Sequence, residues 1–166
     1  MNLLLLRHAQ AEKPDPLVYP DDDKRPLTDI GIKRQRKVAK AFYAMGVRPD
    51  RIITSPRVRA RQTAEITAVA LGCERVLVHS NALGVGYSPE AVLELLATSS
   101  PSEVVMLVGH APDLGLLAGL FLGTTVGAAV RFRKGALLSV SFPSIPRPGE
   151  GTLEFFYRPD DLLVVV

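Results

Sequence analysis

Two histidines and two arginines stand just after apolar runs, where they could act together on a phosphoryl group. Arg7 and His8 follow the first apolar run of the chain. Arg59 follows the run 51–54 by a few residues, and His110 follows the run 103–108. Guanidinium groups bind phosphate oxygens in pairs and keep their charge, while an imidazole can attack phosphorus and a second can stabilise the charge on its oxygens. These residue types indicate phosphoryl-transfer chemistry.

Three arginines lie close together after the second run, and helical geometry separates them. Arg57 and Arg61 are four positions apart and share one helix face, whereas Arg59 points to roughly the opposite side at about 100° per residue. Only one face can line a crevice, so we expect Arg59 to bind phosphate and the other two to be solvated. The free N–H groups of the first helical turn would add to the same anion site.

A parallel sheet is needed to bring these side chains together. Short apolar runs alternate with amphipathic segments, which is typical of α/β proteins. We expect strands at 2–6, 51–54, 75–78, 103–108, 137–142 and 152–157, and helices near 28–45, 56–71, 89–97 and 114–121. The predicted fold is one domain over 1–166, a three-layer α/β/α sandwich with a mostly parallel sheet and an antiparallel strand near the C-terminus. The carboxyl ends of parallel strands line one edge, where ligands bind.

Two hydroxyl residues begin predicted helices. Thr28 is expected to cap one helix, with Asp29 in the first turn and Gly46 ending it. Ser55 is expected to cap the next, with Pro56 at the first helical position. Capping accounts for both residues. They are also candidate substrate-binding positions, since the backbone at Ser55 can shape the pocket.

Composition excludes several other classes of protein. The chain has 166 residues, one cysteine (Cys73) and a formal net charge of +3, which favours a domain without disulfides and gives no indication of nucleic-acid binding. The run Leu3 to Leu6 is too short for a signal peptide. The apolar stretch 114–130 is interrupted by glycines and is better interpreted as a buried helix followed by a loop than as a membrane span. We therefore expect a cytoplasmic protein that binds neither membrane nor nucleic acid.

Four motifs resemble those of the histidine phosphatase (phosphoglycerate mutase-like) superfamily. They are Leu5-Leu6-Arg7-His8-Ala9, the Pro-Leu-Thr-x-x-Gly element 26–31, the arginine motif 55–63 and Val108-Gly109-His110. Each motif alone is weak, but four in the family's order, within residues 2–122, are specific. In length the chain is most similar to the short bacterial phosphohistidine phosphatases of the SixA type.

The resemblance implies a role for each matching residue. His8 would be the phosphorylated nucleophile, Arg7 and Arg59 would hold the phosphoryl oxygens, and His110 would stabilise the transition state. It implies no metal and no organic cofactor. Chemistry adds that one nitrogen of His8 should donate to a fixed acceptor, such as a backbone carbonyl, so that the other is free to attack.

Two positions depart from the family pattern. Ala9 replaces the signature glycine, which is tolerable if its backbone angles are not restricted to glycine. Many members carry a glutamate general acid after the third strand, but residues 80–84 here contain no carboxylate, and Ala82 stands where one is expected. Glu12, Asp113 and Glu90 remain alternative proton donors. Without that acid, phosphohistidine or an aryl phosphate is a better substrate than an alkyl ester.

The length of the chain also bears on the substrate. About two dozen residues separate the third and fourth predicted strands, enough for one short helix but not for the helical lid of relatives that act on small molecules. An open site admits a phosphorylated side chain on another protein, for example a histidine-phosphotransfer domain. The expected partner is thus a phosphorylated protein, or else a small phosphorylated metabolite.

Three alternatives to this function remain open. The alternatives are a small-molecule phosphomonoesterase or mutase with the same site, a non-catalytic phosphate-binding module and a basic nucleic-acid binder.

His79 lacks a motif, and three dispersed histidines do not indicate a metal site. The basic run 33–40 is a solvated helix face or steers an acidic partner. Cys73 is an inert filler, and the apolar tail 162–166 docks on the domain or pairs with another copy.

Overall fold

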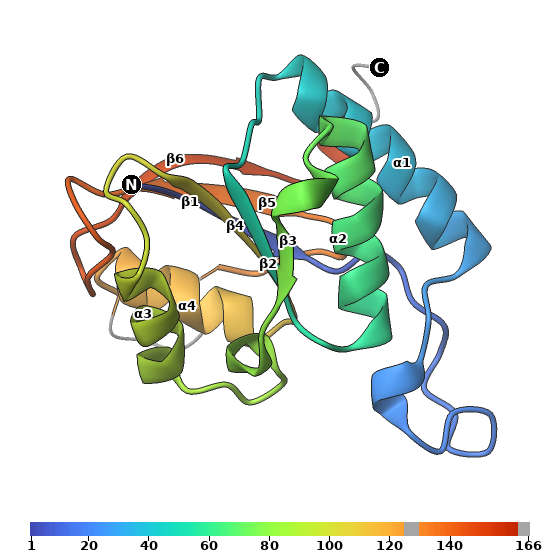
Figure 1. Ribbon diagram of the computed structural model, residues 1–166. Helices are drawn as coiled ribbons and strands as arrows, with labels where there is room; N and C mark the ends of the chain where they lie inside the picture. The colour runs from blue at the N-terminus through green and yellow to red at the C-terminus, as the bar shows by residue number, and fades with distance from the viewer. Residues whose placement is uncertain (125–129, 163–166) are drawn as a thin grey trace.

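In the part of the chain that the structure describes, six strands form one sheet, in the order β3-β2-β4-β1-β5-β6 (Figure 1). The computed structural model describes residues 1–124 and 130–162. The strands are β1 (Asn2–Arg7), β2 (Arg51–Thr54), β3 (Leu77–His79), β4 (Val104–Gly109), β5 (Leu137–Ser141) and β6 (Thr152–Tyr157). The first four run parallel, β5 pairs antiparallel with β1, and β6 pairs antiparallel with β5. The predicted mixed sheet is confirmed.

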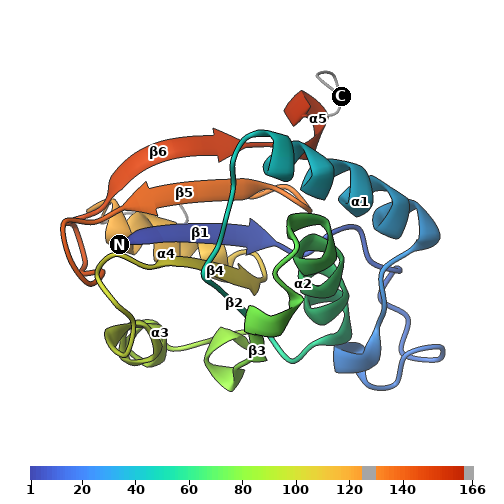
Figure 2. The same ribbon diagram turned by 45° about the horizontal axis from the view of Figure 1, so that its top comes forward.

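Helices cover both faces of the sheet (Figures 1 and 2). On one face lie α1 (Asp29–Ala44) and α2 (Val58–Leu71), and on the other lie α3 (Pro89–Ala97) and α4 (Asp113–Phe121). Short helical turns complete the described chain: η1 (Asp22–Lys24), η2 (Glu74–Val76), η3 (Asn81–Leu83) and α5 (Pro159–Leu162). The three-layer architecture is therefore confirmed.

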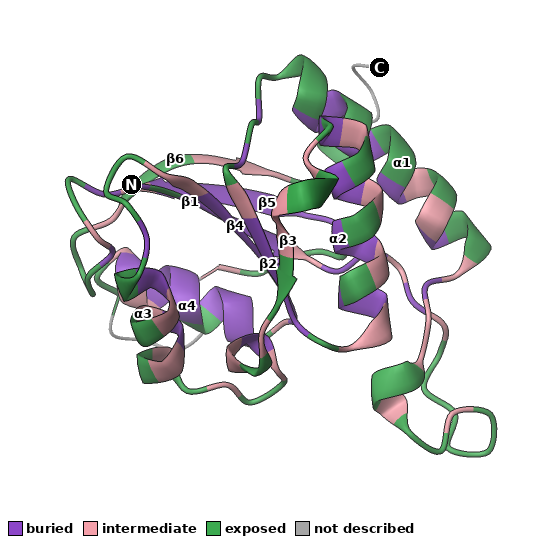
Figure 3. Cartoon of the chain, viewed as in Figure 1, coloured by how far each residue is buried: buried purple, intermediate pink, exposed green. Residues whose placement is uncertain are grey.

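The central strands are apolar throughout because both of their faces are covered. In β1, Leu3 and Leu5 pack with α3 and α4, whereas Leu4 and Leu6 pack with α1 and α2. Figure 3 shows these strands as the buried centre of the molecule. A continuous apolar run is what a strand buried on both sides requires. This burial fixes the ends of β1 and β4, where the candidate residues follow.

The predicted N-cap of α1 is confirmed, and the predicted N-cap of α2 is wrong. Thr28 caps α1, where its side chain accepts a hydrogen bond from the Gly31 N–H at 2.9 Å, and Gly46 follows the helix end with φ +80°. The predicted cap at Ser55 is wrong, because α2 begins at Val58 with Arg57 as its N-cap residue. The Ser55 hydroxyl instead contacts His110. Pro56 therefore precedes the helix.

The remaining differences from prediction concern short or peripheral elements. The expected third strand at 75–78 is instead the turn η2 followed by β3, at the edge of the sheet. Met45, the last residue of the predicted helix 28–45, lies just beyond α1, which ends at Ala44, and is exposed. Of the apolar stretch 114–130, the described part is α4 and the turn after it; 125–129 lie outside the described residues, as do 163–166 of the apolar tail. In the part described, no helix is long and apolar enough to cross a bilayer.

Candidate active site

The carboxyl ends of β1, β2 and β4 meet at one edge of the sheet. Arg7 lies opposite Gly109, and Thr54 lies opposite Val108. The backbone N–H of His8 donates to the Gly109 carbonyl at 3.0 Å, so the pairing of the β1 and β4 backbones continues one residue beyond the end of β1. As a result, the rings of His8 and His110 are 5.2 Å apart between centroids, although the residues are distant in sequence.

A cavity of about 390 Å³ opens at this edge, and we call it the site cavity. Its charged and imidazole lining comprises six cations, two imidazoles and one carboxylate: Arg7, Lys13, Arg25, Arg57, Arg59, Lys134, His8, His110 and Glu12. All four residues predicted to be catalytic lie in this set. The excess of positive charge suits a phosphoryl group with two negative charges.

The imidazole of His8 is held in one tautomer. Its Nδ1 lies 2.7 Å from the carbonyl oxygen of Ala9, and because a carbonyl can only accept, Nδ1 carries the proton. The predicted backbone acceptor is confirmed, and Nε2 is left with a free lone pair. Burial lowers the pKa of His8 to about 3. The hydrogen bond to Ala9 raises this pKa, whereas the charges of His110, Arg59 and Arg7 lower it further. His8 is therefore neutral at pH 7, as a nucleophile must be.

His110 shares this buried, positive environment. Its Nε2 and the Ser55 hydroxyl form a hydrogen bond 2.9 Å long. Burial lowers the pKa of His110 to about 3, and the charge of Arg59 lowers it further. Within the described chain, Nδ1 of His110 is buried and has no hydrogen-bond partner.

Backbone carbonyls orient the two predicted phosphate-binding arginines. Nη1 of Arg7 donates to the Phe132 carbonyl at 2.7 Å, and Nη1 of Arg59 donates to the Asp22 carbonyl at 2.8 Å. In both residues Nε is buried and lacks a partner among the described residues. Both guanidinium groups line the site cavity, so their remaining N–H groups can donate to the oxygens of an anion bound there.

Asp22 is a site residue that the sequence analysis missed. Its carboxylate contacts Arg59 Nη2 at 3.1 Å, Arg57 Nη1 at 3.2 Å and Arg25 Nε at 2.7 Å. The hydrogen bond from Arg25 and the charges of the three guanidinium groups lower the pKa of Asp22. No motif marks this residue, which lies in a loop rich in proline and aspartate.

The prediction for Arg57 is wrong, and the prediction for Arg61 is confirmed. Arg57 lines the site cavity and binds Asp23 at 2.8 Å as well as Asp22. It precedes α2 in an extended conformation (φ −62°, ψ 134°), so helical periodicity does not apply to it. Arg61 is exposed and lies 3.5 Å from Glu65.

Ala9 fits the position of the family's glycine without strain. No described residue other than glycine has a positive φ, so Ala9 needs no backbone freedom that only glycine has. Its N–H donates to the Thr63 hydroxyl at 3.0 Å, and that hydroxyl donates to the Arg59 carbonyl at 2.7 Å. Thr63 thus ties the His8 loop to the start of α2.

The remaining candidate residues differ in whether they line the site cavity. Thr28 caps α1 and is not among the residues that line the site cavity. Of the three carboxylates considered as proton donors, Glu12 lines the cavity. Asp113 accepts from the Gly86 N–H at 3.1 Å, and Glu90 is exposed beside Ser88. Ala82 lies in η3, directly after the end of β3.

Comparison with known proteins agrees with this geometry. A model of the histidine phosphatase superfamily (branch 1) matches residues 3–81. An uncharacterized protein of Picosynechococcus sp. is 33% identical over 147 residues, which are 84% of each chain. The phosphohistidine phosphatase SixA of Escherichia coli is 28% identical over 166 residues, covering 98% of this chain and 96% of SixA. A structure of the protein histidine phosphatase SixA complexed with tungstate has the same fold, with a TM-score of 0.78 at 24% identity over 98% of this chain and 99% of SixA.

Proposed function

We propose that this chain, which belongs to the histidine phosphatase superfamily, removes phosphate from phosphohistidine on another protein without a metal ion. The observation that carries the proposal is the state of His8. Its Nδ1–H is bound to the Ala9 carbonyl, so Nε2 is unprotonated, and it lies beside His110 and two orientated guanidinium groups. This arrangement prepares an imidazole for attack on phosphorus.

The reaction proceeds in two displacements. Nε2 of His8 forms a bond to phosphorus as the bond from phosphorus to the substrate nitrogen breaks, and the electron pair leaves with that nitrogen. Arg7, Arg59 and His110 stabilise the charge on the phosphoryl oxygens. Water then attacks the phosphorylated His8, which regenerates the imidazole and releases inorganic phosphate.

Phosphohistidine suits a site without a carboxylate after β3. When the second ring nitrogen of the substrate is protonated, a neutral imidazole leaves and no acid is required. An alkoxide leaving group does need a proton, and η3 and the residues beside it, 80–84, provide no carboxylate. The similarity to SixA from E. coli, a phosphohistidine phosphatase, supports the same substrate class.

A trapping experiment tests the intermediate. Wild-type protein, His8→Ala and the control His79→Ala are mixed with labelled acyl or aryl phosphate and quenched. We expect label that is stable in base and lost in acid on the wild type and on His79→Ala, whose residue is exposed on β3. Equal labelling of His8→Ala would exclude His8 as the phosphorylated residue.

A substrate panel tests the substrate class. Phosphohistidine peptide is compared with sugar phosphates and phosphoglycerate at equal concentrations. We expect the largest kcat/KM for the phosphohistidine peptide. A larger value for a small metabolite would favour the phosphomonoesterase or mutase alternative, and no turnover of any substrate would favour a phosphate-binding module.

A further inference from the structure

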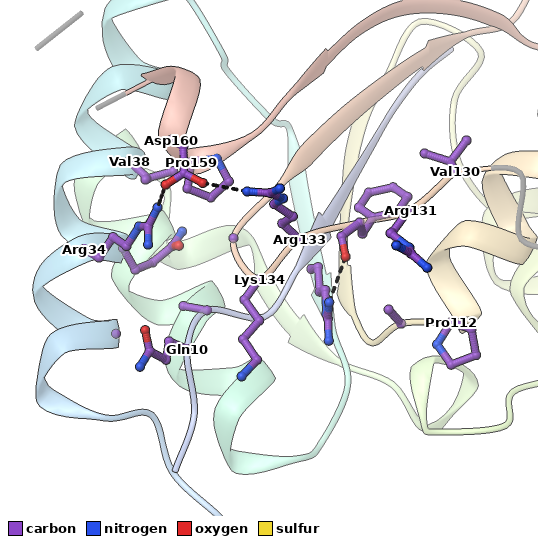
Figure 4. A pocket seen from close by; sticks show the side chains of 17 residues that line it. Gln10, Arg34, Val38, Pro112, Val130, Arg131, Arg133, Lys134, Pro159 and Asp160 are labelled. Carbon is purple, nitrogen blue, oxygen red and sulfur yellow. Dashed lines mark hydrogen bonds and ion pairs between the residues drawn. The ribbon is translucent and has the colours of Figure 1, made fainter. Parts of the chain in front are cut away.

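A second cavity of about 760 Å³ adjoins the site cavity. It lies between α1, α5 and residues 130–135, and Figure 4 shows its lining. Arg7, Ala111 and Lys134 line both cavities, so the two lie side by side. We call the second cavity the basic groove. The proposed reaction does not account for it, because His8 and His110 line the site cavity and not this second cavity.

The charges of the groove are unbalanced. Its cations are Arg7, Arg34, Arg131, Arg133 and Lys134, and its one carboxylate in the described chain is Asp160. Asp160 pairs with Arg34 and, at 3.1 Å, with Arg133, as the dashed lines in Figure 4 mark. The hydrogen bond from Arg34 helps to lower the pKa of this carboxyl group.

Arg131 and Lys134 hold part of the positive charge that Asp160 does not neutralise. Both are exposed, and neither forms an ion pair with any residue that the structure describes. Partial burial of the otherwise exposed Lys134 side chain and the nearby charges of Arg7 and Arg25 lower the pKa of Lys134, so cations crowd the junction between the two cavities. A carboxylate placed here would relieve that repulsion.

The groove also has apolar walls. Val38, Pro112, Val130 and Pro159 line it between the charged groups. Its volume lies within the usual range of ligand clefts, about 300–1,000 Å³. A stretch of polypeptide with acidic and apolar side chains complements this lining.

We propose that the basic groove binds an acidic segment of the phosphoprotein substrate while its phosphohistidine occupies the site cavity. This inference rests on the proposed function and adds how the substrate protein is selected. A carboxylate of the segment pairs with Arg131, and the segment passes Lys134 on its way to the site cavity. A small phosphate ester occupies the site cavity alone and does not contact Arg131.

Two synthetic phosphohistidine peptides test the proposal. One has aspartate and glutamate beside the phosphohistidine, and the other has asparagine and glutamine at the same positions. For the wild type we expect kcat/KM to be about fivefold higher with the acidic peptide at low salt, as one or two exposed ion pairs provide, and the difference to shrink in high salt. Arg131→Glu should abolish or invert the preference.

A control variant and a second substrate make the test specific. Arg147→Glu makes the same charge change at an exposed position between β5 and β6, outside the groove, and should keep the preference of the wild type. Arg131→Glu should hydrolyse an aryl phosphate at the wild-type rate, which also shows that it folds.

The possible failures are distinguishable. If Arg131→Glu keeps the preference for the acidic peptide, or if the wild type has none, the groove proposal is overturned while hydrolysis of phosphohistidine stands. If the wild type hydrolyses the aryl phosphate but neither peptide, the proposed substrate class itself fails.

Discussion

Asp22 binds Arg59 through both its backbone and its side chain. Nη1 of Arg59 donates to the Asp22 carbonyl at 2.8 Å, and Nη2 lies 3.1 Å from a carboxylate oxygen of the same residue. A turn distant in sequence thus holds the arginine that we propose binds the phosphoryl group. The contact also brings a negative charge next to the site that we propose binds an anion.

Asp22→Asn removes that charge and keeps the carbonyl contact that orients Arg59. We expect inorganic phosphate to bind about threefold more tightly, because one repulsive charge at short range in a solvated site is removed. Calorimetric titration measures the effect. Asp21→Asn is the matched control, since Asp21 pairs with Lys24 at 3.6 Å and has no contact with Arg59. Weaker phosphate binding by Asp22→Asn would mean that the carboxylate mainly orients Arg59.

Ser55 is expected to act as a positioning residue for His110. Ser55→Ala removes the 2.9 Å hydrogen bond to His110 Nε2 and should lower kcat for an aryl phosphate roughly tenfold, the value of one hydrogen bond. KM should change little, because the arginines that we propose bind phosphate are untouched. Ser102→Ala, at an exposed turn before β4, should have wild-type kinetics. A rise in KM without a fall in kcat would contradict this role.

The two buried imidazoles should make stability depend on pH. Burial lowers the pKa of both His8 and His110 from 6.5 to about 3 in the folded protein. Between these values the unfolded chain binds protons that the folded chain does not, so stability is complete above pH 6.5 and is lost as the pH falls toward 3. Each imidazole should cost about 1 kcal/mol per pH unit in this window.

Urea unfolding at pH 7 and pH 5 measures this dependence. His8→Asn and His110→Asn should each lose less stability than the wild type over this interval. His79→Asn, an exposed control, should lose as much as the wild type. Identical losses in all four proteins would show that the buried imidazoles do not cause the dependence.

Gly31 is expected to tolerate no side chain. A Cβ at this position would clash with the carbonyl oxygen of Gln10, in the loop that follows His8. Gly31→Ala should therefore destabilise the protein by about 1–3 kcal/mol and lower turnover, because the loop must shift. Gly46→Ala, at a positive φ with open space around it, should cost stability through backbone strain and leave turnover unchanged. Denaturation and aryl phosphate kinetics together separate the two effects.

Glu12 is the carboxylate that we expect to protonate a poor leaving group, since it lines the site cavity. Glu12→Gln should lower kcat for an alkyl phosphate at least tenfold more than kcat for phosphohistidine. Glu90→Gln is the control, because Glu90 is exposed and bound to Ser88. Equal losses on both substrates would instead assign Glu12 a general structural or binding role.

The sequence alone allowed the main features to be predicted. The apolar run of β1 and the spacing of apolar residues in α1 predicted these two elements. The positions of Arg7, His8 and His110 after apolar runs predicted that the three side chains lie close together. Local rules succeeded there because strand ends in a parallel sheet necessarily meet at one edge. They failed at Arg57, which looked helical but precedes the helix, and at Ser55, whose hydroxyl contacts His110 instead of capping α2.

The pattern of apolar and polar residues thus determined the α/β architecture and which residue types reach the sheet edge. Both features follow from the local geometry of strands and helices and from the need to bury their apolar faces. Tertiary structure alone decided the tautomer of His8, the contact of Asp22 with Arg59 and the basic groove beside the site. Each of these depends on how loops of no regular pattern fold back onto the sheet. Such placements arise from long-range packing and charge, which no local spacing encodes.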